Sequence, residues 1–105
     1  MEGTLVTCCV KYVIDPYKIE QFEEYARLWP PIVVRMGGIH HGYFLPGEGA
    51  NNIALALFSF PSLAAYEEYR RSMTQDPESQ SAFELEKRNR SVLSYERTFM
   101  RPLLG

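Results

Sequence analysis

The segment 52–60 (NIALALFSF) places apolar side chains on both faces of a predicted strand. A short run rich in Ile, Leu and Phe that follows turn residues is typical of a β-strand, in which successive side chains point to opposite faces. One face would carry Ile53, Leu55 and Leu57, and the other would carry Ala54, Ala56, Phe58 and Phe60. A strand with one face in water normally alternates apolar with polar residues. This strand therefore belongs in a sheet that is covered on both sides.

Three further strands are predicted from the same kind of evidence. Residues 4–14 are rich in Val, Thr, Ile and Tyr and again have few polar side chains on either face. Residues 39–45 and 91–101 are predicted to be the second and fourth strands, and the turn residues of 46–51 join the second strand to the third.

A helix is predicted after the first strand. Asp15-Pro16 is a helix start signal, and apolar residues follow at helical spacing as far as Trp29. Pro30-Pro31 is expected to interrupt the helix, because proline lacks a backbone donor. Residues 32–36 would then add one more turn before Gly37-Gly38 ends it.

Two more helices are predicted between the third and fourth strands. Ser62 is expected to cap the first of them, whose inner face would consist of Leu63, Tyr66, Tyr69 and Met73. Asp76-Pro77 starts the last helix, which is predicted to end near Asn89. Its spacing favours surface ion pairs between Glu84 and Arg88 and between Glu86 and Arg90.

The order strand, helix, strand, strand, helix, strand predicts an α+β fold, the ferredoxin-like βαββαβ sandwich with helices on one face of an antiparallel sheet. Several apolar side chains left in water on the other face would cost several kcal/mol at ~25 cal/mol per Å², comparable with the stability of a whole domain. A second copy of the same sheet, packed face to face, removes that cost. We therefore predict a homodimer that forms a dimeric α/β barrel.

Composition limits the other possibilities. The length of 105 residues predicts one domain spanning 1–105, and the net charge of −2 argues against a nucleic-acid partner. The sequence has no signal-peptide pattern and no apolar run near the ~18 residues of a membrane span, so we expect a cytoplasmic protein. Cys8 and Cys9 are adjacent, which disfavours both a disulfide and a chelating pair. No metal and no cofactor are predicted.

Over essentially the whole chain, the sequence resembles the NIPSNAP family of the dimeric α/β-barrel superfamily. The segments that carry the resemblance are Lys11-Tyr12-Val13-Ile14, Gly42-Tyr43-Phe44, residues 52–60, Pro61 to Arg71, Asp76-Pro77 and Phe99-Met100-Arg101-Pro102. The family usually opens with a Glu-Leu-Arg-x-Tyr strand followed by Pro-Gly. This chain instead has Cys8-Cys9-Val10-Lys11-Tyr12 and then Asp15-Pro16-Tyr17.

The resemblance implies a fold and a dimer more than a reaction. Most known NIPSNAP proteins have no assigned enzymatic activity, and some eukaryotic members are associated with mitochondria and membrane traffic. The wider superfamily includes cofactor-independent monooxygenases, haem-degrading enzymes and small decarboxylases and dehydratases, which share a pocket between sheet and helices. Function has to be argued from such a site rather than from the fold.

His40 and His41 are the candidate catalytic residues, because histidine titrates near neutral pH. As neighbours on a strand, their rings should point to opposite faces, so one of them would face the pocket. The sequence does not say which one. A hydrogen-bonded histidine at the start of a strand is the alternative interpretation.

Tyr12, Trp29 and Tyr43 are candidate ligand-binding residues, because aromatic side chains with polar tips suit a pocket for a planar organic ligand. The alternative is that they are simple core residues. Arg97 is a further candidate, since it shares a strand face with Tyr95 and Phe99 and a guanidinium inside the domain needs an acid or an anionic ligand. Its acid could be Glu24 or Glu96, or the side chain could be exposed.

These observations leave three hypotheses for the function. The leading one is a NIPSNAP-like protein that binds a small, largely apolar ligand between sheet and helices. One alternative is a cofactor-independent monooxygenase-like enzyme, and the other is an interaction or trafficking module without catalysis. The mid-strand cysteines and the acid in Pro46-Gly47-Glu48-Gly49 argue against thiol catalysis and a phosphate-binding loop.

Overall fold

Strands and helices follow one another in the predicted order. The computed structural model describes residues 5–103, so Thr4 of the predicted first strand lies outside the described residues. The elements are β1 (Val6–Ile14), η2 (Pro16–Lys18), α1 (Ile19–Ala26), α2 (Trp29–Arg35), β2 (Ile39–Phe44), β3 (Ile53–Phe60), α3 (Leu63–Met73), α4 (Pro77–Asn89) and β4 (Val92–Met100).

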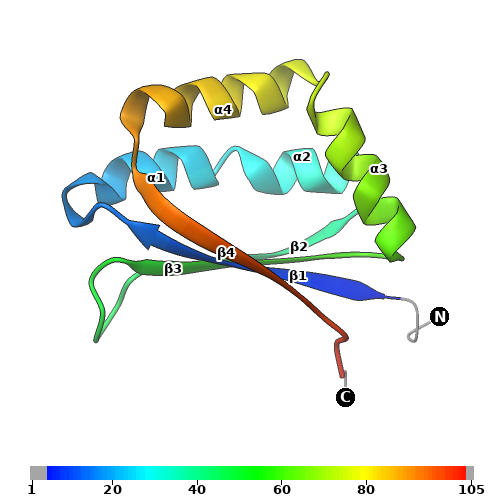
Figure 1. The fold of residues 1–105 in the computed structure, drawn as a ribbon, viewed down its shortest axis with the longest axis horizontal. Coiled ribbons are helices and arrows are strands. Elements are labelled where there is room, and N and C mark those ends of the chain that lie inside the picture. Colours follow the sequence, from blue (N-terminus) through cyan, green and yellow to red (C-terminus); the bar gives the residue numbers. More distant parts are fainter. Residues whose placement is uncertain (1–4, 104–105) are drawn as a thin grey trace.

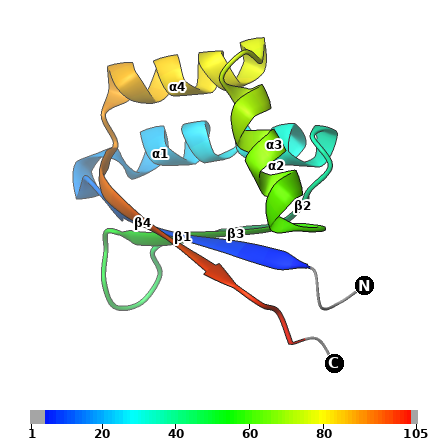
Figure 2. The ribbon, with the colours of Figure 1, turned by 45° about the vertical axis from the view of Figure 1, so that its right-hand side comes forward.

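The strands form one antiparallel sheet in the order β2-β3-β1-β4. All of the helices lie on the same side of this sheet, with α4 in the outer position above α1 (Figure 1). The turned view shows the same two layers (Figure 2). This confirms the prediction of an α+β, ferredoxin-like sandwich. No helix in the described part of the chain is long and apolar enough to cross a membrane.

The core lies between the sheet and the helices. The even-numbered residues of the central strands β1 and β3 face it, as the alternation predicted, and Cys8, Val10, Ala54, Ala56 and Phe60 are buried there. Helices α1 and α2 contribute Phe22, Tyr25, Ala26, Trp29, Ile32 and Val33 to the same cluster. One face of the predicted two-faced sheet is therefore packed within a single protomer.

The opposite face of the sheet, here called the open face, has no described element over it (Figures 1 and 2). Ile53, Leu55 and Leu57 lie on it and are only half-buried. On β2, Ile39 and Phe44 are 56% and 52% exposed. The chain thus leaves partly exposed the apolar side chains that the sequence assigned to a second covered face.

The first helical segment differs from its prediction. It divides at Arg27 and Leu28, and α2 begins at Trp29 with the two prolines in its first turn. A proline in the first turn of a helix costs little, because the N–H it lacks would have no partner inside the helix. Pro30-Pro31 therefore starts a helix rather than interrupting one.

The predicted caps of the later helices are confirmed. The Ser62 hydroxyl accepts a hydrogen bond from the Ala65 N–H at 3.1 Å. The Asp76 carboxylate accepts one from the Ser79 N–H at 2.9 Å and pairs with both terminal nitrogens of Arg35. Hydrogen bonds from Arg35 hold the pKa of Asp76 well below its usual range. The bonds between Arg35 and Asp76 connect the end of α2 to the start of α4.

Two details of the helix predictions are wrong. Leu63 was expected on the inner face of α3, but it is 52% exposed at the first position of the helix, whereas Tyr66, Tyr69 and Met73 are buried. The ion pairs formed by the described residues include neither Glu84 with Arg88 nor Glu86 with Arg90. The Glu86 carboxylate instead accepts hydrogen bonds from the Ser91 hydroxyl and the Val92 N–H, so it fixes the start of β4.

Candidate functional site

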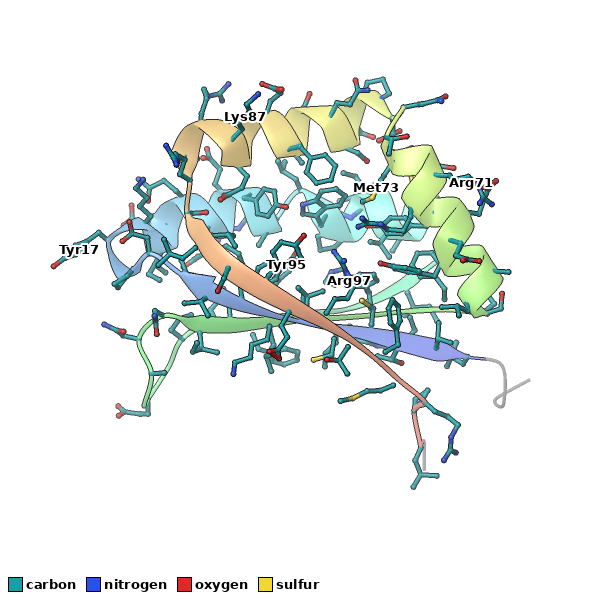
Figure 3. All side chains as sticks on the ribbon, viewed as in Figure 1. Tyr17, Arg71, Met73, Lys87, Tyr95 and Arg97 are labelled. Atoms are coloured by element: carbon teal, nitrogen blue, oxygen red, sulfur yellow. The ribbon has the colours of Figure 1, made fainter. Side chains whose placement is uncertain are left out.

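A pocket lies between the helix-facing side of the sheet and the helices, and it reaches the edge strand β4. Its outer chamber has a volume of about 470 Å³, and a smaller inner chamber has about 60 Å³. The two chambers share the lining residues Val10, Tyr12, Tyr25, Arg70, Phe83 and Arg97. Tyr95 and Arg97 point from β4 toward the helices (Figure 3). The outer chamber falls within the range of roughly 300–1,000 Å³ that is usual for small-molecule sites.

The three aromatic residues predicted to bind a ligand all line the inner chamber. Tyr12 stacks with Tyr43 at 6.3 Å between ring centroids, and both rings pack against Phe22 of α1. Trp29 contacts Phe83 of α4, with centroids 5.1 Å apart. Burial raises the pKa of Tyr12 and Tyr43, so both hydroxyls are neutral near neutral pH. These rings thus give the chamber an aromatic, uncharged surface, and Arg70 and Arg97 are its charged lining residues.

His40 also lines the inner chamber. Its ring stacks on Tyr43 and Phe58, at 5.1 and 5.6 Å between centroids. Burial, with a smaller contribution from the neighbouring His41, lowers the pKa of His40 from 6.5 to about 4. The Gly42 N–H donates to His40 Nδ1 at 3.0 Å, so the proton of the neutral ring is on Nε2. His40 therefore offers the site a hydrogen-bond donor rather than a base.

A bulge in β2 brings His40 and Tyr43 to the same side of the sheet. His40 pairs with Phe58 and Gly42 pairs with Leu57, so His41 is an extra residue of β2 that has no partner on β3. Gly42 adopts a φ of +117°, a backbone conformation that side chains other than glycine rarely allow. Strict alternation would have placed His40 and Tyr43 on opposite faces. A glycine inside a predicted strand is the sequence signal for such a bulge.

His41 lies outside the pocket. Its Nε2 is 2.7 Å from the Ser59 hydroxyl, which in turn is 2.7 Å from the Thr7 hydroxyl. Thr7 and Ser59 are cross-strand partners and belong to the open face of the sheet. The structure thus separates the two histidines, as the sequence required, and it places only His40 in the pocket.

Arg97 lies opposite Val10 on the helix-facing side of β4 and lines both chambers. Its guanidinium carbon is 5.4 Å from the centroid of the Tyr95 ring. The Nε atom is buried and has no hydrogen-bond partner. A buried donor without a partner typically costs about 1–3 kcal/mol. Neither Glu24 nor Glu96 forms an ion pair with Arg97 in the described part of the chain.

Arg70 and Glu86 line the pocket as well, and sequence reasoning did not assign them there. Arg70 follows Tyr66 by four positions on α3, so helical spacing places it beside the buried stripe. Glu86 follows Ala82 by four positions on α4 in the same way. The helical spacing of both residues can be read from the sequence, but a charged residue next to a buried apolar stripe of a helix is usually interpreted as solvent-exposed.

The remaining reactive groups do not extend the site. Burial raises the pKa of the Cys8 thiol to about 11, with Arg97 acting in the opposite direction, so Cys8 is protonated and a poor nucleophile. The described residues contain no group of three or more His, Cys, Asp or Glu side chains that could hold a metal ion.

Comparison with known proteins assigns the family. A NIPSNAP family model matches residues 9–104. The chain belongs to the NIPSNAP family. No curated protein matches it in sequence.

Solved structures of other NIPSNAP proteins share the fold at low sequence identity. A NIPSNAP family protein of unknown function from Agrobacterium tumefaciens is 19% identical, with a TM-score of 0.81 over 97% of this chain and 91% of that one. An uncharacterized NIPSNAP-like domain protein from Burkholderia xenovorans is 18% identical, with a TM-score of 0.77 over 96% and 87%.

A candidate antibiotic biosynthesis monooxygenase from Nitrosomonas europaea is also similar, with 10% identity and a TM-score of 0.73 over 98% of this chain and 94% of that one. Such low identities establish a common fold for this NIPSNAP protein and no common chemistry.

Proposed function

We propose that this NIPSNAP protein is a homodimer in which each protomer binds a small, largely apolar ligand between sheet and helices. The observation that carries the ligand proposal is the outer chamber of about 470 Å³, which continues into an aromatic inner chamber. Pockets of this size, lined by aromatic side chains and a few polar groups, are the usual form of a small-molecule site. An interaction module without a ligand has no need for such a space.

The homodimer proposal rests on apolar side chains that the protomer leaves exposed. They are Ile39 and Phe44 on β2, Met100 on the edge strand β4, and the half-buried Ile53, Leu55 and Leu57 of β3, all on the open face. The strands place Lys11 and Glu96 on the open face as cross-strand neighbours of opposite charge. Two copies can therefore meet without net repulsion, and a second copy is the partner that fits a self-complementary surface.

Light scattering at micromolar concentration tests the dimer, and we expect twice the protomer mass of 12.1 kDa. A monomer in that range would overturn this part of the proposal. Ligand binding is tested by native mass spectrometry of the purified protein, followed by calorimetry with a panel of bicyclic aromatic compounds. Failure of every compound to bind, together with no co-purified molecule, would contradict the ligand proposal.

A monooxygenase-like activity is the second candidate. It is favoured by His40, which is neutral in the inner chamber and carries its proton on Nε2. Such a donor would stabilise negative charge that develops on a substrate oxygen. Oxygen uptake with a panel of quinols, and a parallel screen of haem substrates, would test it. We expect His40→Ala to abolish any activity found and His41→Ala to leave it, so equal activity of all three proteins would contradict this assignment.

We also propose a cytoplasmic location. Both cysteines are free thiols, the state that a reducing compartment maintains. Fractionation of cells that produce the untagged protein would test this, and recovery from another compartment would contradict it.

A further inference from the structure

Arg97 differs from the paired arginines of the described chain. Arg35 and Arg71 lie on helices and Arg27 lies at the C-terminal end of α1, and each has a carboxylate within 3.4 Å. Arg97 lines both chambers of the pocket, and its buried Nε has no partner. The Tyr95 ring near its guanidinium satisfies none of the N–H donors directly. The Nε–H of Arg97 can therefore donate a hydrogen bond to an acceptor that is not part of the chain.

The charged groups around the pocket add up to one positive charge. Arg97 and Arg70 are cationic, and Glu86 is the acid that lines the chambers. The Glu86 carboxylate is already held by the Ser91 hydroxyl and the Val92 N–H, so these bonds direct it toward the backbone of β4. His40 is neutral near neutral pH, as are the lining tyrosines whose pKa is raised by burial. A single negative charge on the ligand would balance the site.

We propose that the ligand is an organic monoanion, a carboxylate with a flat apolar body, and that Arg97 binds its carboxylate. This deepens the proposed function and rests on it. The Nε–H and one terminal N–H of a guanidinium form a fork that matches the two oxygens of a carboxylate, and Nε is the atom that lacks a partner here.

The shape of the pocket agrees with this assignment. The inner chamber of about 60 Å³ is far smaller than a usual small-molecule site, so the ligand body occupies the outer chamber. There Phe83, Leu93 and Tyr95 offer apolar surface. Because Arg97 lines both chambers, it stands where the outer chamber meets the inner one. A dianion such as phosphate would exceed the positive charge of the site and meet Glu86 as well, and a neutral ligand would leave Arg97 unpaired.

Calorimetry at neutral pH with 2-naphthoate and 2-naphthamide separates charge from shape, because the two compounds differ in a single group. We expect the wild-type protein to bind the carboxylate at least about tenfold more tightly than the amide. Arg97→Gln should remove that preference while leaving amide binding unchanged, and Arg97→Lys should retain part of it. Arg71→Gln is the matched control, since Arg71 lies on the exposed side of α3 and pairs with Glu68.

The other possible binding results distinguish failure of this inference from failure of the proposed function. Equal binding of both compounds to the wild-type protein overturns the monoanion assignment and leaves the proposed ligand pocket standing. A preference that survives Arg97→Gln overturns the role of Arg97. Binding of neither compound overturns the inference and counts against the proposed pocket as well. The melting temperature of Arg97→Gln should be unchanged or higher, because the substitution removes a half-buried charge whose buried Nε has no hydrogen-bond partner, and a fall would indicate a structural role.

Discussion

The two faces of the sheet differ in what covers them, although the sequence gives both an apolar character. On the helix-facing side, Phe60 is 1% exposed and packs with aromatic rings of α3. On the open face, Phe44 is 52% exposed and no described element lies over it. The difference teaches that apolar content alone does not define a core, and that a face without a partner in its own chain is evidence about assembly.

Truncation of one phenylalanine on each face tests most directly whether the two faces differ in their contribution to stability. We expect Phe60→Ala to lower the free energy of unfolding by about 3–5 kcal/mol, because it leaves a cavity between β3 and α3. Phe44→Ala should cost less than about 1 kcal/mol in the isolated protomer, since half of the side chain is already in water. Urea denaturation at the lowest workable concentration measures both, and equal losses would contradict the distinction between the faces.

A charge on the open face tests what covers it. We expect Leu57→Lys to weaken the proposed homodimer at least about 100-fold, equivalent to roughly 2.7 kcal/mol, because two-fold symmetry buries the charge twice. Leu63→Lys is the matched control, since Leu63 is an exposed leucine of the helical layer. Light scattering over a dilution series measures the shift. The same mass profile for both variants would argue against a dimer through the open face.

Gly38 tests how closely the covered side is packed. A Cβ added there would lie 2.8 Å from Phe60 Cζ and from Val33 Cγ1, closer than real contacts allow. We expect Gly38→Ala to cost about 1–3 kcal/mol of stability through overpacking. Gly47→Ala, where a Cβ would meet nothing within 4 Å, is the control and should have little effect. Thermal unfolding compares the two, and a neutral Gly38→Ala would mean that this part of the core is loose.

His40 gives the covered side a pH dependence. Its pKa is about 4 in the folded protein against 6.5 in the unfolded chain, so the unfolded state binds more protons between these values. Stability is therefore retained above pH 6.5 and lost as the pH falls toward 4. We expect a loss of roughly 1–2 kcal/mol from this group, less than complete burial would give, because the ring is only half-buried.

The same measurement on His40→Gln isolates this group from the carboxylates that titrate at lower pH. Urea denaturation at several values between pH 4 and 6.5 should give a shallower fall for the variant than for the wild-type protein. Parallel curves would show that His40 is not the cause.

The sequence predicted the fold well, because the fold depends on signals that act locally. Alternation identified the strands, and Ser62 and Asp76 marked the starts of α3 and α4. The division of the first helix was misplaced, because Pro30-Pro31 can begin a helix as readily as it can interrupt one.

The site was predicted less completely. Tyr12, Trp29, Tyr43 and Arg97 do line one pocket, and whether they bind a ligand stays a prediction. The choice between His40 and His41 required the strand register, which a bulge changes. Glu86 was predicted to pair with Arg90, whereas its carboxylate accepts hydrogen bonds from Ser91 and Val92, because the chain turns into β4 directly after α4. The local sequence pattern does not predict which distant segments of the chain come into contact.

The bulge at His41 determines which mutations of β2 keep the pocket residues in place. The residues of β2 before the bulge and those after it are out of phase, so His40 and Tyr43 meet in the pocket while His41 remains outside. Deletion of His41 would restore regular alternation and would leave His40 and Tyr43 two residues apart, still on the same side of the sheet. Loss of the bulge without a change of length, for example through a residue at position 42 that cannot adopt the φ of +117° that Gly42 has, would instead put His40 and Tyr43 on opposite faces and move one of them from the pocket to the open face.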